Sequence, residues 1–531
     1  MAAETRTTLP RSGPTGKPMD RLDRGLAAYE QAAKPVLILV FIIAAVLPIY
    51  FFAGPLRLSF LRLFLLIMFV PLLFRWLSGK YGGIIFPDIA LIFLIFWMFV
   101  SLTFNHGLTR SVEFFAIQIV ELLGSYLLAR VYIRDKASFV YFIRVLLWVI
   151  LFILPFAIYE SLSRSMLISQ VLGAIPGLSV HPNVFYESRL GLFRAQATFE
   201  HPILFGVFCS TGFAMAWFGL QVERMGPAKR LFWAMTAGLG AFFSISSGAL
   251  LAIVTQIGLI VWNAVMGFMR KHWRLLIIII AVFYVVIDLL SNRTPITVFI
   301  SFATFNSGTA YWRVLIWEFG SAEVWRHPIF GLGLHDWLRP AWMHSSSVDN
   351  FWLVMAMRYG LPGFFAVTAS FLTILIRVSR MDFSHDPDLA ACQKAYVITV
   401  ICLFGSICTV HIWGAVFVYA VFLVASGAWM FTSDLGADAD QAEAAGGARS
   451  RGKTRGENRG ENRDRPGTGR APRRGGAGSD LNADLGADLD ADLGAGTALE
   501  DPAPKRFYSP RDPNHGKPGA RSARRKPRPR R

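Results

Sequence analysis

The side chains best suited to chemistry lie in a polar stretch, residues 291–350, between two hydrophobic segments of the chain. This stretch contains arginine, histidine and aspartate but no lysine: Arg293, Arg313, Arg326, Arg339, His327, His335, His344, Asp336 and Asp349. Lysine would serve equally well for solubility, whereas a guanidinium group offers a planar, bidentate grip on phosphate or carboxylate. The stretch therefore predicts a site for an anionic substrate.

The segments that flank this stretch are those of a membrane protein. Of 531 residues, 54% are hydrophobic and only 17% are charged, which is too apolar for an ordinary soluble protein. Apolar runs of roughly twenty residues, enough to cross the hydrocarbon layer, predict an all-α polytopic membrane protein with about 12 transmembrane helices. The runs are 35–54, 56–74, 83–104, 112–133, 138–160, 202–221, 230–247, 249–268, 273–290, 351–377, 393–412 and 414–432.

Positive charge predicts how these helices are oriented. Lysine and arginine fall on alternate short loops, which the positive-inside rule places in the cytoplasm together with both termini. The opposite side then carries two large loops, 161–200 and 291–350, and both contain arginine but no lysine. We therefore expect the chemistry on the non-cytoplasmic side.

Composition divides the chain into three parts. Residues 1–34 form a basic cytoplasmic segment, 35–432 a transmembrane catalytic domain, and 433–531 a low-complexity tail. The tail has too little apolar surface to fold and is expected to be disordered. Its Asp-x-Asp triplets, at 438–440 and 488–490, lie within Ala/Gly repeats and do not indicate a metal–nucleotide site.

The remaining composition excludes several other classes of function. The formal net charge of +18 is concentrated toward the two ends of the chain, so it does not indicate a nucleic-acid partner. The basic end, 521–531, either contacts anionic lipid or is simply solvated. Four cysteines lie in or beside apolar runs without a CxxC pattern, so neither a zinc site nor a disulfide framework is expected.

Three groups of residues on the non-cytoplasmic side have spacings of interest. The first runs from Leu192 through Arg194 to Glu200-His201-Pro202, the second from Tyr311 through Arg313 and Trp317 to Arg326-His-Pro-Ile-Phe-Gly331-Leu-Gly333, and the third from Asp349-Asn350 to Gly360-Leu-Pro-Gly363. Taken alone, a His-Pro pair at a helix start is usually a structural cap, and Gly331-x-Gly333 is too short for a dinucleotide loop. Two charges inside predicted spans, Glu121 and Arg358, are functional candidates.

Together, these groups and the predicted spans resemble the O-antigen ligase and polymerase superfamily over residues 35–432. The resemblance implies a GT-C-like fold in the bacterial inner (cytoplasmic) membrane with two large periplasmic loops. It also implies inverting, metal-independent glycosyl transfer at the periplasmic face, without a cofactor. The implied donor is an undecaprenyl-diphosphate-linked glycan, and the implied acceptor is a glycan or lipid A-core. The lipid bilayer and other membrane proteins of polysaccharide assembly are the further expected partners.

The resemblance also suggests roles for individual residues. Arg194 and Arg313 match the arginines that hold the donor diphosphate, and Arg326 is either a third cation or a cap of the loop. Ligases carry a histidine as acceptor base where this chain has Asp349, so the catalytic group is either Asp349 or His344. The Asp-Asn pair is more similar to polymerases, which favours polymerisation of O-antigen or exopolysaccharide repeats.

Three other functions are compatible with parts of the sequence. A ligase would transfer the glycan to lipid A-core, as in lipopolysaccharide assembly, or to a protein hydroxyl. A lipid-glycan transporter or flippase should show internal repeats and paired charges in the middle of its spans, and no convincing repeat is seen. A scaffold for a cell-envelope export complex would leave the arginines of the outer loops unexplained.

Overall fold

The computed structural model describes residues 36–53, 56–79, 83–181, 186, 188–269, 271–292, 294–295, 298 and 307–432. All of them belong to the first of two units, Met1–Glu457, whereas the second unit, Asn458–Arg531, lies outside the described residues. The predicted segments 1–34 and 433–531 also lie outside them.

The predicted all-α polytopic class is confirmed, since ten helices in the described part of the chain are long and apolar enough to cross a membrane. Seven are single helices: α2 (Phe60–Leu77), α3 (Phe86–His106), α6 (Lys136–Ser163), α11 (Ser247–Met266), α12 (His272–Leu290), α15 (Phe351–Arg380) and α16 (Pro387–Ile407). Two others contain a π-helical turn: Leu108–Tyr132, which comprises α4 (Leu108–Gln118), η1 (Ile119–Leu123) and α5 (Gly124–Tyr132), and Pro202–Gly219, which comprises α8 (Pro202–Ser210), α9 (Gly212–Ala214) and η2 (Met215–Gly219). The tenth, Gly414–Thr432, begins with α17 (Gly414–Ala425).

Two of the predicted spans are shorter than the sequence suggests. The first run, 35–54, is helical only over Val36–Val46 and then becomes strand β1 (Ile49–Ala53). Pro48 cannot donate a backbone hydrogen bond, and the isoleucine and aromatic residues that follow it favour extended backbone. The other, α10 (Pro227–Phe243), has 17 residues and so extends about 26 Å, slightly less than the hydrocarbon thickness.

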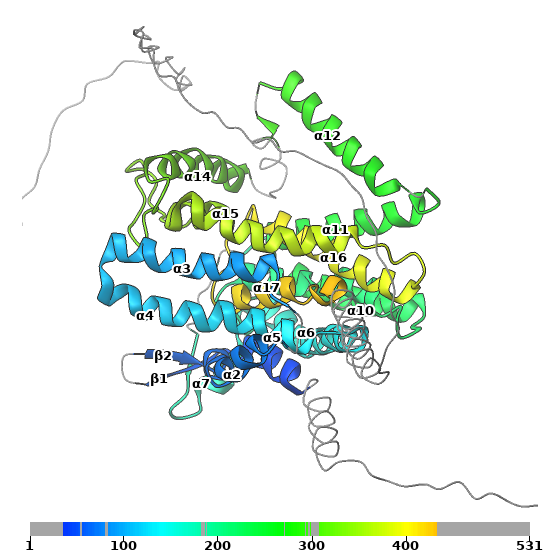
Figure 1. Ribbon diagram of the computed structural model, residues 1–531, viewed down its shortest axis with the longest axis horizontal. Helices are drawn as coiled ribbons and strands as arrows, with labels where there is room; N and C mark the ends of the chain where they lie inside the picture. Colours follow the sequence, from blue (N-terminus) through cyan, green and yellow to red (C-terminus); the bar gives the residue numbers. More distant parts are fainter. Residues whose placement is uncertain are drawn as a thin grey trace, which may run out of the picture. The chain divides into compact units, whose positions relative to one another are not determined.

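A small antiparallel sheet is the main departure from the all-helical prediction. Strand β1 pairs on one edge with β2 (Leu56–Ser59) and on the other with β3 (Ser179–Val180). The sheet therefore joins the N-terminal region to the predicted outer loop 161–200, which also contains α7 (Leu167–Gly173). In Figure 1, β1, β2 and α7 lie toward the left side of the described unit, and so does α14 (Ser307–Arg326) of the loop 291–350.

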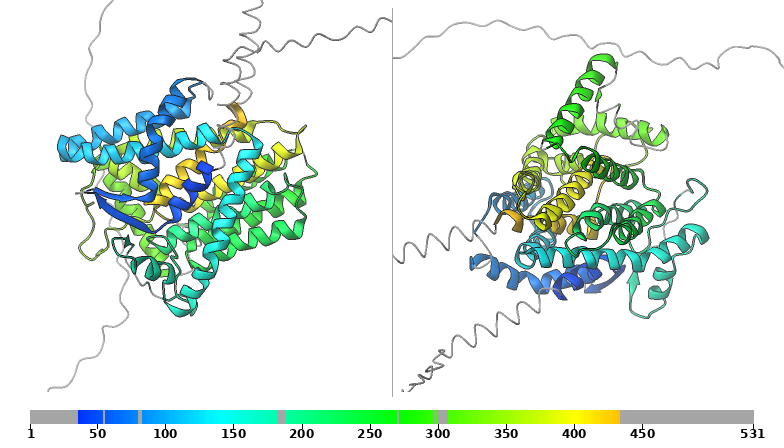
Figure 2. Two further views of the ribbon diagram at one scale, coloured as in Figure 1. Left: turned by 90° about the horizontal axis from the view of Figure 1, so that it is seen from below. Right: turned by 90° about the vertical axis from the view of Figure 1, so that its right-hand side faces the viewer.

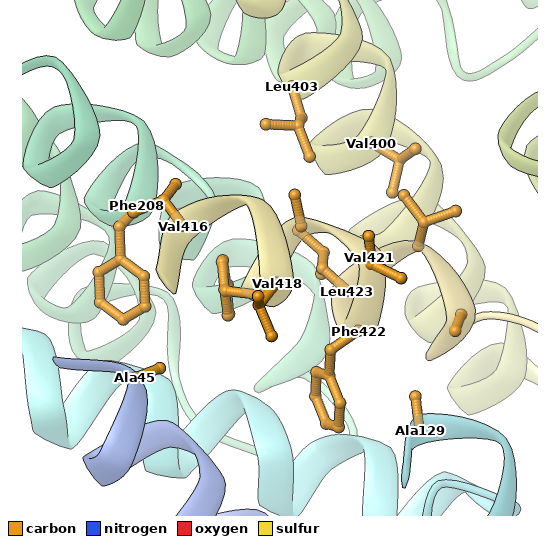
Figure 3. Close-up of a cluster of buried hydrophobic side chains, with 14 of the residues drawn as sticks. Ala45, Ala129, Phe208, Val400, Leu403, Val416, Val418, Val421, Phe422 and Leu423 are labelled. Carbon is orange, nitrogen blue, oxygen red and sulfur yellow. The ribbon is translucent and has the colours of Figure 1, made fainter. Parts of the chain in front are cut away.

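Helix α17 forms the centre of the hydrophobic core. Figure 3 shows Val416, Val418, Val421, Phe422 and Leu423 of this helix among side chains of surrounding helices, and each of the five is 0–1% exposed. A helix that is apolar on all sides is stable only when it is covered on all sides, or when it contacts lipid. Helix α12 is the opposite case, because it has no buried residue and stands clear of its neighbours in Figure 2.

Candidate functional site

The end of helix α6 positions the segment that carries Arg194. The carboxylate of Glu160 accepts hydrogen bonds from the backbone N–H groups of Gln196 (2.9 Å) and Ala197 (2.8 Å). The backbone N–H of Phe193 donates to the carbonyl of Ser161 (3.0 Å). These bonds fix both sides of Arg194, and Ala197 adopts a left-handed φ of 52°, a strained conformation that the surrounding contacts must hold.

Arg194 is a largely buried cation. Its guanidinium lies over the ring of Tyr186, 5.5 Å from the ring centre. Burial and the nearby charge of Arg189 lower the pKa of Arg194 to about 10, and Tyr186 and Asp349 oppose this lowering. Within the described residues, the buried Nε atom of Arg194 has no hydrogen-bond partner. The guanidinium therefore keeps an unused donor in a largely buried position.

Arg313 is the second buried arginine. It lies on α14, and its side chain is held where that helix packs against α15. Its Nη2 atom donates to Ser247 Oγ at the start of α11 (3.4 Å), while its buried Nε and Nη1 atoms have no partner among the described residues. Burial lowers the pKa of Arg313, Asp349 opposes this effect, and Arg189 adds to it.

Asp349 is an acidic group near both of these arginines. It shares a small cavity with Arg313, Trp317 and Asn350, and its charge acts on both Arg194 and Arg313. Asn350 caps α15, because its side chain accepts a hydrogen bond from the backbone N–H of Leu353 (3.1 Å). We call Arg189, Arg194, Arg313 and Asp349 the arginine cluster.

The glycine pattern has a structural role next to this cluster. Helix α15 breaks at Gly360 (φ 70°), and the segment after α14 fills the break: the N–H of Leu332 donates to the carbonyl of Met357 (2.7 Å), and that of Leu361 donates to the carbonyl of Pro328 (2.7 Å). A Cβ atom at Gly360 would collide with the carbonyl oxygen of Ile329. Backbone hydrogen bonds between the segment of Gly331-x-Gly333 and the segment of Gly360-Leu-Pro-Gly363 therefore hold the end of α14 against α15.

The structure brings together three of the five predicted site residues, namely Arg194, Arg313 and Asp349. Arg326 instead pairs with the buried carboxylate of Glu323, three residues earlier in its own helix (2.8 Å). His344 is exposed. Arg293 lies outside the described residues.

Two histidines complete the surroundings of the cluster. His201 caps α8 as predicted for a His-Pro pair, since its Nδ1 accepts a hydrogen bond from the backbone N–H of Ile203 (3.0 Å). The other His-Pro pair differs, because His327 follows the end of α14 and caps no helix start. Burial, Arg194 and Arg189 lower the pKa of His201 to about 4. His411, buried between the rings of Phe351 and Trp413, has its pKa lowered to about 3 by burial and by Arg358.

Sequence reasoning missed Arg189, His411 and Trp413 as neighbours of the site. Arg189 carries the same signal as Arg194, an arginine in an outer loop without lysine, and could have been included. His411 and Trp413 lie just before α17, in a short connection between two apolar helices, where the sequence shows no pattern that indicates a site. Their position follows only from tertiary packing.

Metal ions in proteins are commonly held by clusters of His, Cys, Asp and Glu side chains. Within the described residues, no group of three or more His, Cys, Asp or Glu side chains is arranged to hold a metal ion. Metal-independent transfer remains a prediction.

Residues 231–368 match the protein-family model described as O-antigen ligase, Wzy_C. The matched range starts in α10 and includes Arg313, Asp349 and the break in α15, while Arg194 precedes it. No curated protein matches the chain.

Proposed function

We propose, from the premise that this chain belongs to the O-antigen ligase and polymerase superfamily, that it polymerises lipid-linked oligosaccharide repeats on the periplasmic face of the inner membrane. The family match and the ten apolar helices make it a multi-pass membrane protein that transfers glycans in O-antigen synthesis. The donor in this proposal is an undecaprenyl-diphosphate-linked glycan, and the acceptor is a sugar hydroxyl of a second repeat.

The observation that carries the proposal is the set of unused donors in the arginine cluster. Buried N–H groups in proteins almost always have a partner, yet Nε of Arg194 and both Nε and Nη1 of Arg313 have none among the described residues. Phosphate oxygens match guanidinium donors in charge and geometry. Three arginines against one carboxylate leave the cluster with a positive charge that suits a diphosphate.

The chemistry follows from this placement. The acceptor oxygen attacks the anomeric carbon of the donor from the face opposite the diphosphate, and the bond from that carbon to the diphosphate oxygen breaks. The electron pair of that bond leaves with the diphosphate, whose growing charge Arg194 and Arg313 stabilise. The hydroxyl proton passes to a nearby base, and Asp349 is better placed for this than the exposed His344.

The substitution Arg313→Lys tests the diphosphate role. Lysine keeps the charge but loses the bidentate grip, so we expect turnover to fall roughly a hundredfold with normal membrane insertion. Arg380→Lys, an exposed position at the other end of α15, is the matched control. Lipopolysaccharide and exopolysaccharide from a deletion strain carrying each variant would be profiled, and wild-type product from Arg313→Lys would overturn the proposal.

The same profile separates polymerase from ligase. Single repeats on lipid A-core in the deletion strain indicate a lost polymerase, whereas bare core together with accumulated lipid-linked polymer indicates a lost ligase.

Asp349→Ala and His344→Ala, compared in the same strain, test the acceptor base. We expect a loss of about a hundredfold for Asp349→Ala and wild-type product for His344→Ala. The reverse result would assign the role to His344.

A further inference from the structure

A second polar cavity lies beside the arginine cluster. It is lined by the N-terminal hairpin and the two helices that flank it (Val36–Val46 and α2), by the π-helical turn η1, by the loop before α8 and by the start of α17. Its volume is about 90 Å³, whereas one water needs about 10–15 Å³. We call this cavity the hairpin pocket; its polar lining residues include Tyr50, Arg57, Arg62, Glu121, His181 and Glu200.

The outer part of the hairpin pocket is organised around Glu200. One carboxylate oxygen accepts a hydrogen bond from the indole N–H of Trp413 (2.9 Å), and the other lies 3.6 Å from the guanidinium of Arg57. Arg57 also lies 3.2 Å from Nδ1 of His181 and over the ring of Tyr50, 3.9 Å from its centre. An aromatic face and several donors and acceptors are thus held together.

The inner part of the pocket contains the Glu121–Arg62 ion pair, at 2.5 Å. Glu121 is only 7% exposed and lies in η1, within a predicted membrane span. A carboxylate at such a position is costly unless it is paired, and π-helical turns often mark functional sites. Arg62 also donates to the backbone carbonyl of Arg57 (2.9 Å), which links the inner and outer parts.

The charges of the hairpin pocket are balanced. Two arginines face two glutamates, and burial lowers the pKa of His181, which favours its neutral form. A pocket of this kind attracts a diphosphate less than the arginine cluster does. Carboxylates that accept, guanidinium groups that donate and an aromatic face are instead suited to the hydroxyl groups and ring of a sugar.

An apolar groove continues from the hairpin pocket. It lies along α6, between the helix Val36–Val46 and α7, with a volume of about 1000 Å³. Leu47 and Thr198 line both the groove and the pocket. Exposed side chains such as Ile43, Trp148 and Phe152 form much of the groove wall, so a hydrocarbon chain could enter it from the lipid. We call it the α6 groove.

We propose that the hairpin pocket and the α6 groove together bind the acceptor as a lipid-linked glycan. Its sugar lies in the pocket, its hydrocarbon chain lies in the groove, and the diphosphate that joins them lies outside the pocket, at the junction that Leu47 and Thr198 line. This inference rests on the proposed function, because it requires a donor that occupies the arginine cluster at the same time. Glu200 and His201 are consecutive residues that face the two sites: Glu200 lines the pocket, and His201 packs against Tyr186 (4.6 Å) beside Arg194.

The test counts lipid-linked glycans bound to the full-length protein in lipid nanodiscs by native mass spectrometry. The probe is an undecaprenyl-diphosphate-linked oligosaccharide repeat in which a methylene group replaces the anomeric oxygen, so that the sugar cannot be transferred. We expect two copies per wild-type chain. Ile43→Trp, which fills the groove, and the isosteric Glu200→Gln should each weaken binding of one copy about tenfold or more. Arg313→Lys should weaken binding of the other.

Ile92→Trp, at an exposed position on α3 outside the groove, is the control for an added tryptophan. If Ile43→Trp and Glu200→Gln both retain two copies, the inference is wrong. One wild-type copy that only Arg313→Lys removes would also overturn it while leaving the proposed donor site intact. No copy at all on the wild type would overturn the proposed function itself. Equal binding of undecaprenyl phosphate without sugar would show that the pocket does not recognise the glycan.

Discussion

The arginine cluster and the hairpin pocket use the same side chain in two different ways. In the cluster, Arg194 and Arg313 are buried and have unused donors among the described residues. In the pocket, Arg62 and Arg57 lie against the carboxylates of Glu121 and Glu200. An arginine therefore indicates an anion site only when the rest of the protein leaves its hydrogen-bond donors unpaired.

This contrast also explains why two such sites can lie next to each other. A diphosphate is an anion whereas a sugar hydroxyl is neutral, and the two sites also differ in charge. His201, Trp413 and Glu200 form the boundary: the rings of His201 and Trp413 are 5.6 Å apart, and Trp413 donates to Glu200. Only the side chains of this boundary would therefore separate a glycan acceptor in the pocket from the donor site.

Removing one arginine from each site tests whether the free and the paired arginines contribute differently to turnover. Arg194→Gln removes a free cation, and we expect turnover to fall roughly a hundredfold or more. Arg57→Gln removes a charge that is already paired and partly exposed, so we expect a loss of less than about tenfold. Glycan product formed by each purified variant from a lipid-linked repeat would be measured. Equal losses would erase the distinction between the two sites.

A smaller effect is expected where the cluster depends on the break in α15. Gly360→Ala places a Cβ against the carbonyl of Ile329 at a φ of 70°, and such strain costs roughly 1–3 kcal/mol. Gly405→Ala, in α16 with open space around it, should instead stabilise the protein by about 0.5–1 kcal/mol. Thermal unfolding in detergent measures both variants. A neutral Gly360→Ala would show that the backbone hydrogen bonds at this break do not stabilise α15.

The sequence was sufficient for the parts of this molecule that depend on local pattern. Apolar runs located the ten long helices, and the contrast between arginine and lysine pointed to the two outer loops that contain Arg194 and Arg313. An ion pair of Arg326 could also be expected from the sequence, because Glu323 stands three residues earlier on the same helix face. Local periodicity and residue type are properties of a few neighbouring positions, so the features that depend on them can be predicted without knowledge of the tertiary structure.

The hairpin pocket could not be predicted in the same way. Residues 49–53 are apolar and aromatic, so the run 35–54 satisfies the criterion for a membrane span although its second half is a strand. Glu121 and Glu200 come together only because this strand folds back beside η1 and the loop before α8. Strand pairing between distant segments depends on tertiary packing, which no local pattern records.

The smallest expected effect concerns a histidine in each site. Burial, Arg194 and Arg189 lower the pKa of His201 to about 4. Burial also lowers the pKa of His181; there Glu200 opposes the lowering and Arg57 adds to it. The unfolded chain takes up a proton near pH 6.5, which folded His201 does not bind until about pH 4. The stability that neutral His201 contributes is therefore complete above about pH 6.5 and is lost as the pH falls toward 4.

His201→Asn removes this titration but keeps a side chain that caps α8, so the thermal midpoint of unfolding should fall less between pH 7 and pH 5 than in the wild type. His181→Asn should change the same pH dependence by a smaller amount, because Glu200 partly compensates a proton on His181. Midpoints of the detergent-solubilised full chain at the two pH values measure both. If His181→Asn flattened the dependence as much as His201→Asn, the arginine cluster would not be the more cationic of the two sites.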